Sequence, residues 1–207
     1  MSAKVLVLCS GGLQSTLLTS LATKEASHVC LLFYNHGQVN QRGERLSFHH
    51  LSDFYDIERY EETISIGVKE KWPRFKLTIM LLHAFIIAKK AGCNLIYYGA
   101  NQELDVARYE RTERTLEYLE TVHLLGYEVQ PQYDEKGFLQ ERVEVQAPLL
   151  LLTWKQIAQL GVEWEAPWHL AWSCETSTTT KPCNECQHCL RHNQLLATAE
   201  EIRSRRK

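Results

Sequence analysis

The length, composition and charge of this chain are those of an ordinary globular protein. Its 207 residues are enough to bury a sizeable core, and 44% hydrophobic with 23% charged residues is typical of one compact domain. The formal net charge of −2 gives no electrostatic footprint for nucleic acid, so we expect no such partner. No apolar run reaches membrane-spanning length, and the first strand begins too early for a signal peptide, so we expect a cytoplasmic protein without membrane contact.

The first predicted element is a strand that leads through a glycine turn into a helix. Residues 4–9 form an apolar run of strand length, followed directly by Ser10, Gly11 and Gly12. Leucines then recur at helical spacing from Leu13 onward, which predicts a helix. The free N–H groups and positive dipole end of such a helix bind phosphate, and glycines let the backbone approach a ligand. The spacing matches neither a Walker loop nor GxGxxG, so an ordinary βα turn is an equal alternative.

Strands and helices alternate along the rest of the chain. The helix predicted at 77–91 is apolar nearly all round, which indicates burial against a sheet. A loop or hairpin is expected at 130–140, which is rich in proline, glycine and charge. This alternation predicts an α/β fold with a doubly wound parallel sheet, whose ligands bind at the carboxyl ends of the strands. The other strands are expected at 28–34, 61–66, 94–98 and 143–147, and the other helices at 41–54, 111–125 and 154–160.

The cysteines divide into a cluster near the C-terminus and three that stand apart. The cluster ends in C-x-x-C-x-x-C, and four thiolates at such spacing can converge on one tetrahedral ion, as in structural zinc sites. Unrelated free thiols and an iron–sulfur cluster are the alternatives, but nothing nearby supplies a redox partner. Cys9, Cys30 and Cys93 stand singly in apolar stretches, as core cysteines usually do, and we expect free thiols rather than disulfides. The predicted zinc ligands are Cys174, Cys183, Cys186 and Cys189.

Several other versatile residues have a structural interpretation beside the functional one. His188 flanks the zinc cysteines and is an alternative ligand, whereas most histidines are expected in packing or surface positions. Trp164, Trp168 and Trp172 would either stack on a base or pack the C-terminal lobe on the sheet, and we expect packing. Lys181, beside the cysteines, is expected to be solvated. The acidic residues that offer magnesium ligands, mostly assigned to a solvated helix face, are Glu103, Asp105, Glu110, Glu113 and Glu117.

The two ends of the chain together resemble a known family. The run SGGLQST at 10–16 resembles the SGGxDS phosphate-binding loop of PP-loop ATP pyrophosphatases. The four-cysteine site narrows the resemblance to the QueC-like family of 7-cyano-7-deazaguanine synthases. Further fragments resemble that family in the same order along almost the whole chain, at 33–38, 98–101, 147–157 and 170–174.

This resemblance implies an ATP-binding PP-loop domain at 1–160 and a zinc-binding lobe at 161–207 packed on it. It also implies a carbon–nitrogen ligase that uses ATP and Mg²⁺ to adenylate the carboxylate of 7-carboxy-7-deazaguanine, releasing pyrophosphate. An amine then attacks the acyl-adenylate. In the family the amine is ammonia, and the amide is activated again and dehydrated to a nitrile. The protein's own contribution to such chemistry is mainly positioning and electrostatics.

The resemblance also assigns individual residues to ligands. Catalysis is assigned to Gln14, Ser15 and Lys76. The nucleotide is assigned to Leu8, Cys9, Ser10, Gly11, Gly12, Leu13, Gln14, Ser15 and Thr16. The deazapurine is assigned to Tyr34, Gly37, Gln38, Gly99, Asn101 and Trp172.

Two departures from the family pattern concern the chemistry. The loop has Gln14 where the family has Asp, and a neutral amide is a weaker magnesium ligand than a carboxylate. Further along, Lys76 and Leu77 replace the family's Arg-Asn pair, and Phe75 replaces its glycine. Lysine cannot reproduce the bidentate fork of arginine, and leucine offers no hydrogen bond, so contacts to the substrate are expected to differ.

From Gln14 we predict an enzyme that stops at the amide, because a neutral amide is harder to activate than a carboxylate. The attacking group would be ammonia or a protein amine, the latter in an antiphage system, where QueC-like proteins also occur. The alternative is 7-cyano-7-deazaguanine synthase proper, which uses ammonia and forms the nitrile in queuosine or deazapurine biosynthesis. A scaffold that has lost catalysis and an RNA-modifying PP-loop enzyme are competing classes. A homodimer is also expected.

Overall fold

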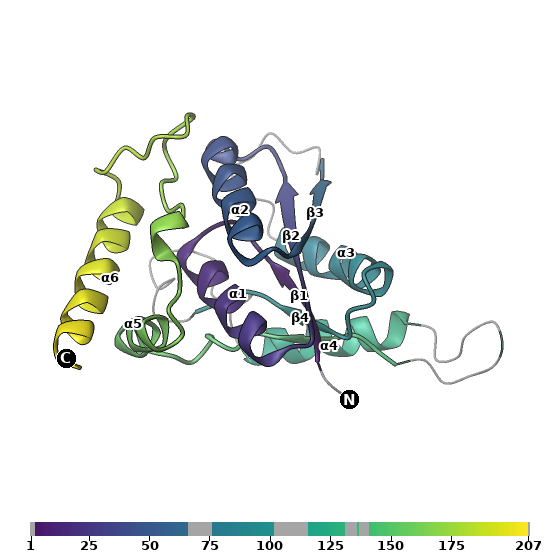
Figure 1. Ribbon diagram of the computed structural model, residues 1–207. Coiled ribbons are helices and arrows are strands. Elements are labelled where there is room, and N and C mark those ends of the chain that lie inside the picture. The colour runs from purple at the N-terminus through teal and green to yellow at the C-terminus, as the bar shows by residue number, and fades with distance from the viewer. Residues whose placement is uncertain (1–2, 66–75, 102–115, 131–135, 137–140, 207) are drawn as a thin grey trace.

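A parallel sheet of five strands forms the centre of the fold (Figure 1). The computed structural model describes residues 3–65, 76–101, 116–130, 136 and 141–206. Within these residues the strand order is β3-β2-β1-β4-β5, and every pair of neighbours is parallel. The order reverses between β1 and β4, which confirms the predicted doubly wound sheet. The strands are β1 (Lys4–Leu8), β2 (His28–Asn35), β3 (Glu58–Thr63), β4 (Leu95–Tyr97) and β5 (Glu144–Gln146).

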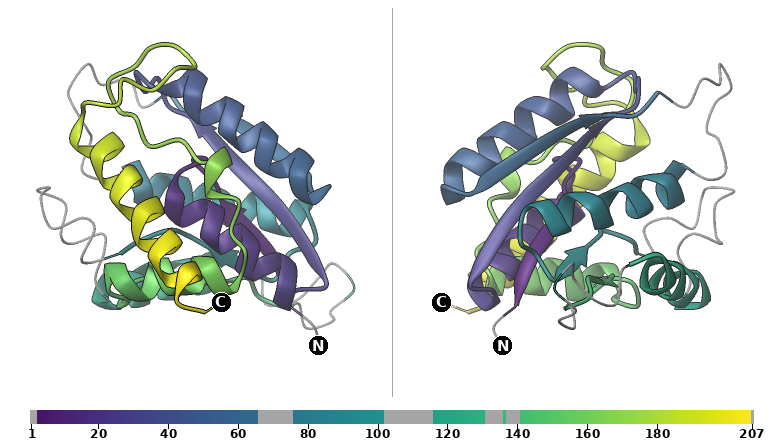
Figure 2. Two further views of the ribbon diagram at one scale, coloured as in Figure 1. Left: turned by 60° about the vertical axis from the view of Figure 1, so that its left-hand side comes forward. Right: turned by 90° about the vertical axis from the view of Figure 1, so that its right-hand side faces the viewer.

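Helices cover both faces of the sheet, as the two turned views show (Figure 2). One face packs against α1, α2, α5 and α6, and the other against α3 and α4. Side chains alternate between the two faces along each strand, so Val5 and Val7 enter the first core and Leu6 the second. The helices are α1 (Leu13–Glu25), α2 (Gln41–Tyr55), α3 (Lys76–Lys90), α4 (Leu116–Val129), α5 (Trp154–Glu163) and α6 (Gln187–Ser204), with a short 3₁₀ helix η2 (Trp168–Leu170).

The C-terminal segment packs on the same core as the rest of the chain. Helix α5 begins at a capping box, in which Thr153 and Gln156 satisfy each other's backbone N–H groups. It continues to Glu163, across the boundary expected at 160. Leu195 and Ala199 of α6 are buried in the core cluster of α1 and β1. The lobe is therefore packed on the sheet domain, while the exact domain boundary stays a prediction.

The element bounds differ from the prediction mainly at the polar edges of the sheet. Strand β3 begins at Glu58, three residues before the predicted 61–66, because an edge strand pairs on one side only and tolerates polar residues. Helix α4 extends to Val129, and the first part of the predicted helix, 111–115, lies outside the described residues. The predicted loop at 130–140 also lies mostly outside them. Helix α6 was not predicted, because its apolar residues form no clear stripe.

The helices can be compared with the length and apolar character that a membrane span requires. None of those in the described part of the chain is both long and apolar enough to span a bilayer.

Candidate functional site

The turn after β1 is built on two glycines that serve different purposes. Gly11 has φ +74°, and a Cβ there would lie 2.7 Å from the backbone oxygen of Glu44 and 2.8 Å from Cβ of Ser47. Only glycine fits, because the turn is pressed against α2. Gly12 is the N-cap of α1 with an ordinary φ of −78°, and the nearest atom to a Cβ there would be Oγ of Ser10 at 3.3 Å. Packing within the chain therefore requires glycine at Gly11 more strictly than at Gly12, whose role toward a ligand stays a prediction.

The N-terminus of α1 has no side-chain cap. The first helical hydrogen bond in this turn runs from the N–H of Thr16 to the carbonyl of Gly12, at 2.9 Å. The N–H groups before it have no partner within the helix and stand at its positive dipole end, which is the arrangement that binds phosphate. The hydroxyl of Thr16 is buried and has no hydrogen-bond partner among the described residues. A group of this kind is normally satisfied from outside, by water or a ligand.

The side chains of two other predicted loop residues, Ser15 and Cys9, are engaged by contacts within the protein. The hydroxyl of Ser15 donates to the carbonyl of Gly12 at 3.0 Å, and this bond holds the turn in place. Cys9 is buried, and burial raises the pKa of its thiol to about 11. Cys9 is therefore a neutral wall of the site and not a nucleophile.

Gln14 faces the end of β4 at the point where the strand order reverses. A Cβ on Gly99 would lie 2.9 Å from Cβ of Gln14, so glycine is needed there for the close approach. Ligands of open α/β sheets bind in this crevice, and the assignment of Gln14 to the nucleotide and to catalysis stays a prediction. Asn101 is fully buried and donates to the carbonyls of Leu149 and Leu152, at 2.6 and 2.8 Å. Its contacts are structural, so its role toward the substrate stays a prediction.

The residues predicted at the end of β2 form a hydrogen-bonded loop. Gln38 accepts from the backbone N–H of His36 at 2.9 Å and donates to the carbonyl of Tyr34 at 3.1 Å. Gly37, between them, has φ +80°. The hydroxyl of Tyr34 donates to the carbonyl of Met80 at 2.9 Å, in the core between β2 and α3. Gln38 and Gly37 thus shape the rim of the site, whereas the Tyr34 hydroxyl is directed into the core.

Lys76, predicted to be catalytic, contacts a histidine that the sequence did not single out. Its Nζ lies 3.1 Å from Nε2 of His36. Burial, and then the positive charge of Lys76, lower the pKa of His36 to about 4. His36 is therefore neutral at pH 7 and accepts a hydrogen bond from the ammonium group. The arrangement fixes a lysine cation at the first residue of α3.

A chain of hydrogen bonds connects this rim to the C-terminal lobe. Glu44 of α2 accepts from Gln38 at 2.8 Å and from Asn40 at 3.0 Å. Burial raises the pKa of Glu44 to about 6. The amide of Asn40 also lies 3.1 Å from the carbonyl of Cys174, one of the predicted metal ligands. Neither Asn40 nor Glu44 belonged to a sequence motif, and only the contact shows their role.

Trp172 joins the same lobe to the glycine turn. Its backbone N–H donates to the carbonyl of Gly11 at 2.7 Å, and its Nε1 donates to the carbonyl of Cys174 at 2.7 Å. The indole lies against Gly43 of α2, where a Cβ would be 2.2 Å from the ring. Trp168 is buried over Gly161 in the same manner. Both tryptophans pack the lobe, as predicted, and Trp172 in addition positions the glycine turn at Gly11.

The four C-terminal cysteines converge as predicted. The sulfur atoms of Cys174, Cys183, Cys186 and Cys189 all lie within 4.8 Å of one another. Asn184 takes a left-handed conformation with φ +62°, which forms the tight turn between two of them. A hydrogen bond from Thr176, and then backbone N–H groups, lower the pKa of Cys183 to about 6. Burial raises the pKa of Cys189 to about 12, so the fit to a tetrahedral metal ion rests on the convergence of the four sulfurs.

The histidines beside the cysteines have other partners. Nε2 of His188 lies 3.2 Å from a carboxylate oxygen of Glu175. Nδ1 of His192 lies 2.8 Å from the hydroxyl of Ser173. His188 is therefore not needed as a replacement ligand, and Lys181 is exposed, as expected.

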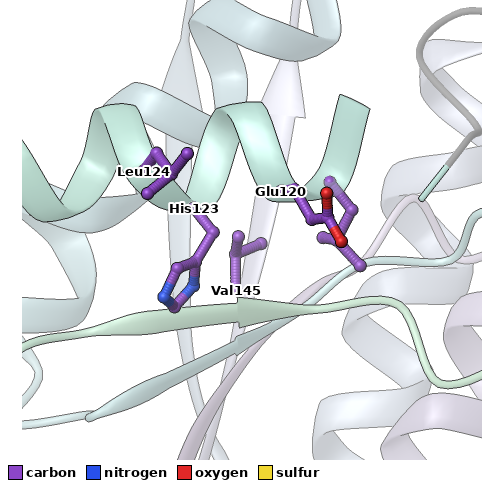
Figure 3. A pocket seen from close by; sticks show the side chains of 5 residues that line it. Glu120, His123, Leu124 and Val145 are labelled. Carbon is purple, nitrogen blue, oxygen red and sulfur yellow. The ribbon is translucent and has the colours of Figure 1, made fainter. Parts of the chain in front are cut away.

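A separate pocket lies between α4 and the edge strand β5 (Figure 3). It encloses about 360 Å³, and His123 points from the helix toward Val145 on the strand. Leu119, Glu120 and Leu124 complete its lining. None of these residues belongs to the predicted loop, substrate or metal residues, so the pocket is distinct from the site described above.

Comparison with known proteins identifies the family. The family model for the queuosine biosynthesis protein QueC matches residues 55–200. The chain belongs to the QueC family. Among its relatives, the 7-cyano-7-deazaguanine synthase of Chlorobaculum tepidum is 26% identical over 221 residues, which cover 94% of this chain and 92% of the relative. The 7-cyano-7-deazaguanine synthase of Campylobacter jejuni is 27% identical over 216 residues, which cover 92% of this chain and 92% of the relative.

Solved structures with the same fold act on different substrates. The U34-tRNA thiolase NcsA from Methanococcus maripaludis, solved with its [4Fe-4S] cluster, has a TM-score of 0.55 and 12% identity over 99% of this chain and 67% of its own. The NMN synthetase from Francisella tularensis has a TM-score of 0.53 and 13% identity, over 100% of this chain and 87% of its own. At such identities the likeness shows the fold alone, which is that of PP-loop ATP pyrophosphatases, as predicted. Membership of the QueC family makes this chain an enzyme of that ATP-using class.

Proposed function

We propose that this protein is a 7-cyano-7-deazaguanine synthase, which converts 7-carboxy-7-deazaguanine to the nitrile with ATP and ammonia. The uncapped N-terminus of α1 behind Gly11 and Gly12, in a chain of the QueC family, is the observation that carries the proposal. The names of the relatives favour this nitrile-forming reaction over the amide-forming one predicted from Gln14. Nitrile synthesis, given above as the alternative to the amide-forming reaction, is therefore the better supported of the two.

The reaction needs two activations of the same carbon. First, a carboxylate oxygen of the substrate attacks the α-phosphorus of ATP, and pyrophosphate leaves. Ammonia then attacks the acyl carbon, AMP leaves and a proton is lost, which gives the amide. Second, the amide oxygen attacks a second ATP with loss of pyrophosphate. Departure of AMP and of both amide protons leaves the carbon–nitrogen triple bond.

The residues of the chain act on these steps mainly by placing charge. The N–H groups before Thr16 hold the phosphates, where negative charge increases as pyrophosphate departs. Lys76, fixed by neutral His36, supplies a cation for the carboxylate or the purine. A lysine is a point charge, so it attracts the carboxylate without fixing its plane as an arginine fork would. Gln14 is the residue of the turn whose side chain faces the end of β4, beside Gly99.

The four cysteines are proposed to hold one structural zinc ion. Zinc would provide folding free energy, because the unfolded chain has no preformed site. It would also fix the carbonyl of Cys174, which accepts from Asn40 and from Trp172. Through these two residues the metal lobe supports the turn at Gly11. Mg²⁺, expected as the companion of ATP, stays a prediction.

A second candidate function rests on Gln14. A neutral side chain at this position is a weaker ligand for magnesium beside the triphosphate. Its effect should be larger on activation of the amide than on activation of the carboxylate, because an amide oxygen is the poorer nucleophile. The product would then be an amide of ammonia or of a protein amine. Nitrile-forming and amide-forming enzymes both release AMP and pyrophosphate, so the kind of nucleotide product does not separate them, whereas the deazapurine product does.

Nucleotide products test the proposed reaction class. We expect AMP and pyrophosphate to appear only when ATP and 7-carboxy-7-deazaguanine are both present, and this dependence excludes the scaffold alternative. ADP as the sole nucleotide product would contradict adenylation. A shift of transfer RNA in a binding assay at moderate salt, with no response to the deazapurine, would favour the RNA-modifying alternative.

A further inference from the structure

A second group of metal-ligating side chains lies at the amino ends of the strands, away from the phosphate-binding turn. His28 and Cys30 are on β2, and Cys93 lies two residues before β4 begins. Their ligand atoms all lie within 4.8 Å of one another. The sequence predicted that Cys30 and Cys93 stand singly as core cysteines. The structure confirms that both are buried in the core, and it also brings these residues, 63 positions apart, close together on one face, since β2 and β4 both pair with β1.

The spacing within this group suits a single ion. Sγ of Cys30 lies 3.2 Å from Nε2 of His28 and 3.7 Å from Oε2 of Glu58 on β3. Tetrahedral zinc with ordinary bond lengths places sulfur and nitrogen ligands about 3.6 Å apart. The other oxygen of Glu58 accepts from the hydroxyl of Tyr60 at 2.8 Å, which is the kind of outer contact that orients a ligating carboxylate.

The two thiols of the group are buried, whereas the imidazole and the carboxylate lie nearer the solvent. Cys30 and Cys93 are 0% and 3% exposed, within the core between β2 and α3. His28 is half-buried and Glu58 is exposed. An ion can therefore reach the thiols from the solvent side, past the imidazole and the carboxylate. Two thiols and one imidazole converge as ligands, and the carboxylate of Glu58, which contacts Cys30, would complete the set of four by turning toward the ion.

We propose that Cys30, Cys93, His28 and Glu58 bind a second Zn²⁺ ion. The ion joins β2, β3 and the turn before β4 at the amino edge of the sheet. Its ligands share no residue with the C-terminal cysteines or with the catalytic loop, so the proposal is independent of the proposed reaction. We expect the ion to raise the thermal stability of the whole chain, since it binds the folded state alone.

Zinc content per chain tests the proposal. After reconstitution under reducing conditions and removal of loosely bound metal, the unmodified protein is expected to hold two zinc ions. The double variant Cys30→Ser and Cys93→Ser is expected to hold one. Because serine at buried positions can impair folding, the variants His28→Gln and Glu58→Gln at the exposed side give a second readout. Each is expected to weaken binding of the second ion at least about tenfold, because losing even an outer contact that orients a ligand costs about 10- to 100-fold.

Glu62→Gln is the matched control, since Glu62 lies on β3 like Glu58 but pairs with Tyr34, at the other end of β2. It is expected to leave both ions in place. One zinc per chain in the unmodified protein, lost on Cys186→Ser, would overturn the proposal. So would a Cys30–Cys93 disulfide in protein purified with reductant, or affinity for the second ion unchanged by His28→Gln and Glu58→Gln.

Discussion

Gly11 and Gly12 differ in what a side chain would do at each position. The sequence predicts that a bulky residue at either one leaves the fold intact and blocks turnover. The structure restricts this to Gly12, because a Cβ at Gly11 would strike the backbone of α2 at Glu44. A substitution at Gly11 therefore tests packing, and a substitution at Gly12 tests phosphate binding.

Gly12→Asn should separate stability from activity. Asparagine is a good N-cap, so its side chain should occupy the N–H groups of α1 and raise the free energy of unfolding by about a few tenths of a kcal/mol. The same contacts are then lost to ATP, and we expect AMP formation to fall about tenfold or more, because each 1.4 kcal/mol of lost binding is about a factor of ten. Gly12→Ala is the control without a capping group. Full activity in Gly12→Asn would show that phosphate does not use this helix end.

Gln14→Asp tests whether the neutral loop residue limits the second activation. Restoring the carboxylate should favour magnesium beside the triphosphate and raise the ratio of nitrile to amide product. Gln14→Asn, which is shorter but still neutral, is the matched control and should not raise the ratio. If Gln14→Asp leaves the ratio unchanged, or lowers it, Gln14 does not determine the product.

His36 provides a direct test of the electrostatics at the site. Its pKa, followed by NMR, is expected near 4, because burial and the charge of Lys76 both disfavour the imidazolium. In Lys76→Met the pKa should rise but stay below the usual 6.5, since burial remains. A value near 6.5 in both proteins would contradict the contact.

The lowered pKa of His36 also makes the stability of the protein depend on pH. The folded pKa of His36 lies below the unfolded one, so the unfolded chain binds more protons between pH 6.5 and 4. The contribution of His36 is fully present above pH 6.5 and is lost as the pH falls through this window. His36→Gln should therefore unfold with a weaker acid dependence between these values than the unmodified protein.

At the scale of elements, the C-terminal lobe and the glycine turn form one unit. Trp172 and Ser47 both contact the carbonyl of Gly11, and Trp172 and Asn40 both contact the carbonyl of Cys174. Loss of the metal should therefore disturb the turn as well as the lobe.

Cys186→Ser tests this coupling. The variant is expected to lose the zinc held by the four C-terminal cysteines, by elemental analysis, and to become insoluble or loosely folded. Cys186→His is the matched control, because three cysteines and one histidine still form a zinc site. Its metal content and turnover should recover together. Turnover that survives complete loss of this zinc would contradict a supporting role for the lobe.

At the scale of the whole molecule, local sequence patterns predicted the architecture well. Apolar runs marked β1, β2 and β4, and the order of strand, glycine turn and helix predicted the turn that follows β1. The cysteine spacing correctly predicted that the four C-terminal cysteines converge, because they lie close together along the chain. Such features depend on neighbours in sequence, which a single chain displays directly.

The parts that were missed depend on contacts between distant residues. The pairing of His36 with Lys76 and the link from Asn40 to Cys174 span 40 and 134 positions. Cys30 and Cys93 approach each other only because β1 lies between their strands. The sequence gives His36, Asn40, Cys30 and Cys93 only an ordinary surface or core interpretation, and only the folded structure shows their partners.

The deazapurine product decides the central claim most directly. The unmodified protein, incubated with 7-carboxy-7-deazaguanine, ATP, Mg²⁺ and ammonia, is examined by mass spectrometry over time. Nitrile synthesis predicts transient amide followed by 7-cyano-7-deazaguanine, with two AMP released for each nitrile. An amide that accumulates without nitrile would contradict the synthase assignment and favour the amide-forming enzyme. Recovery of the carboxylate unchanged, from protein with its metal in place, would contradict both.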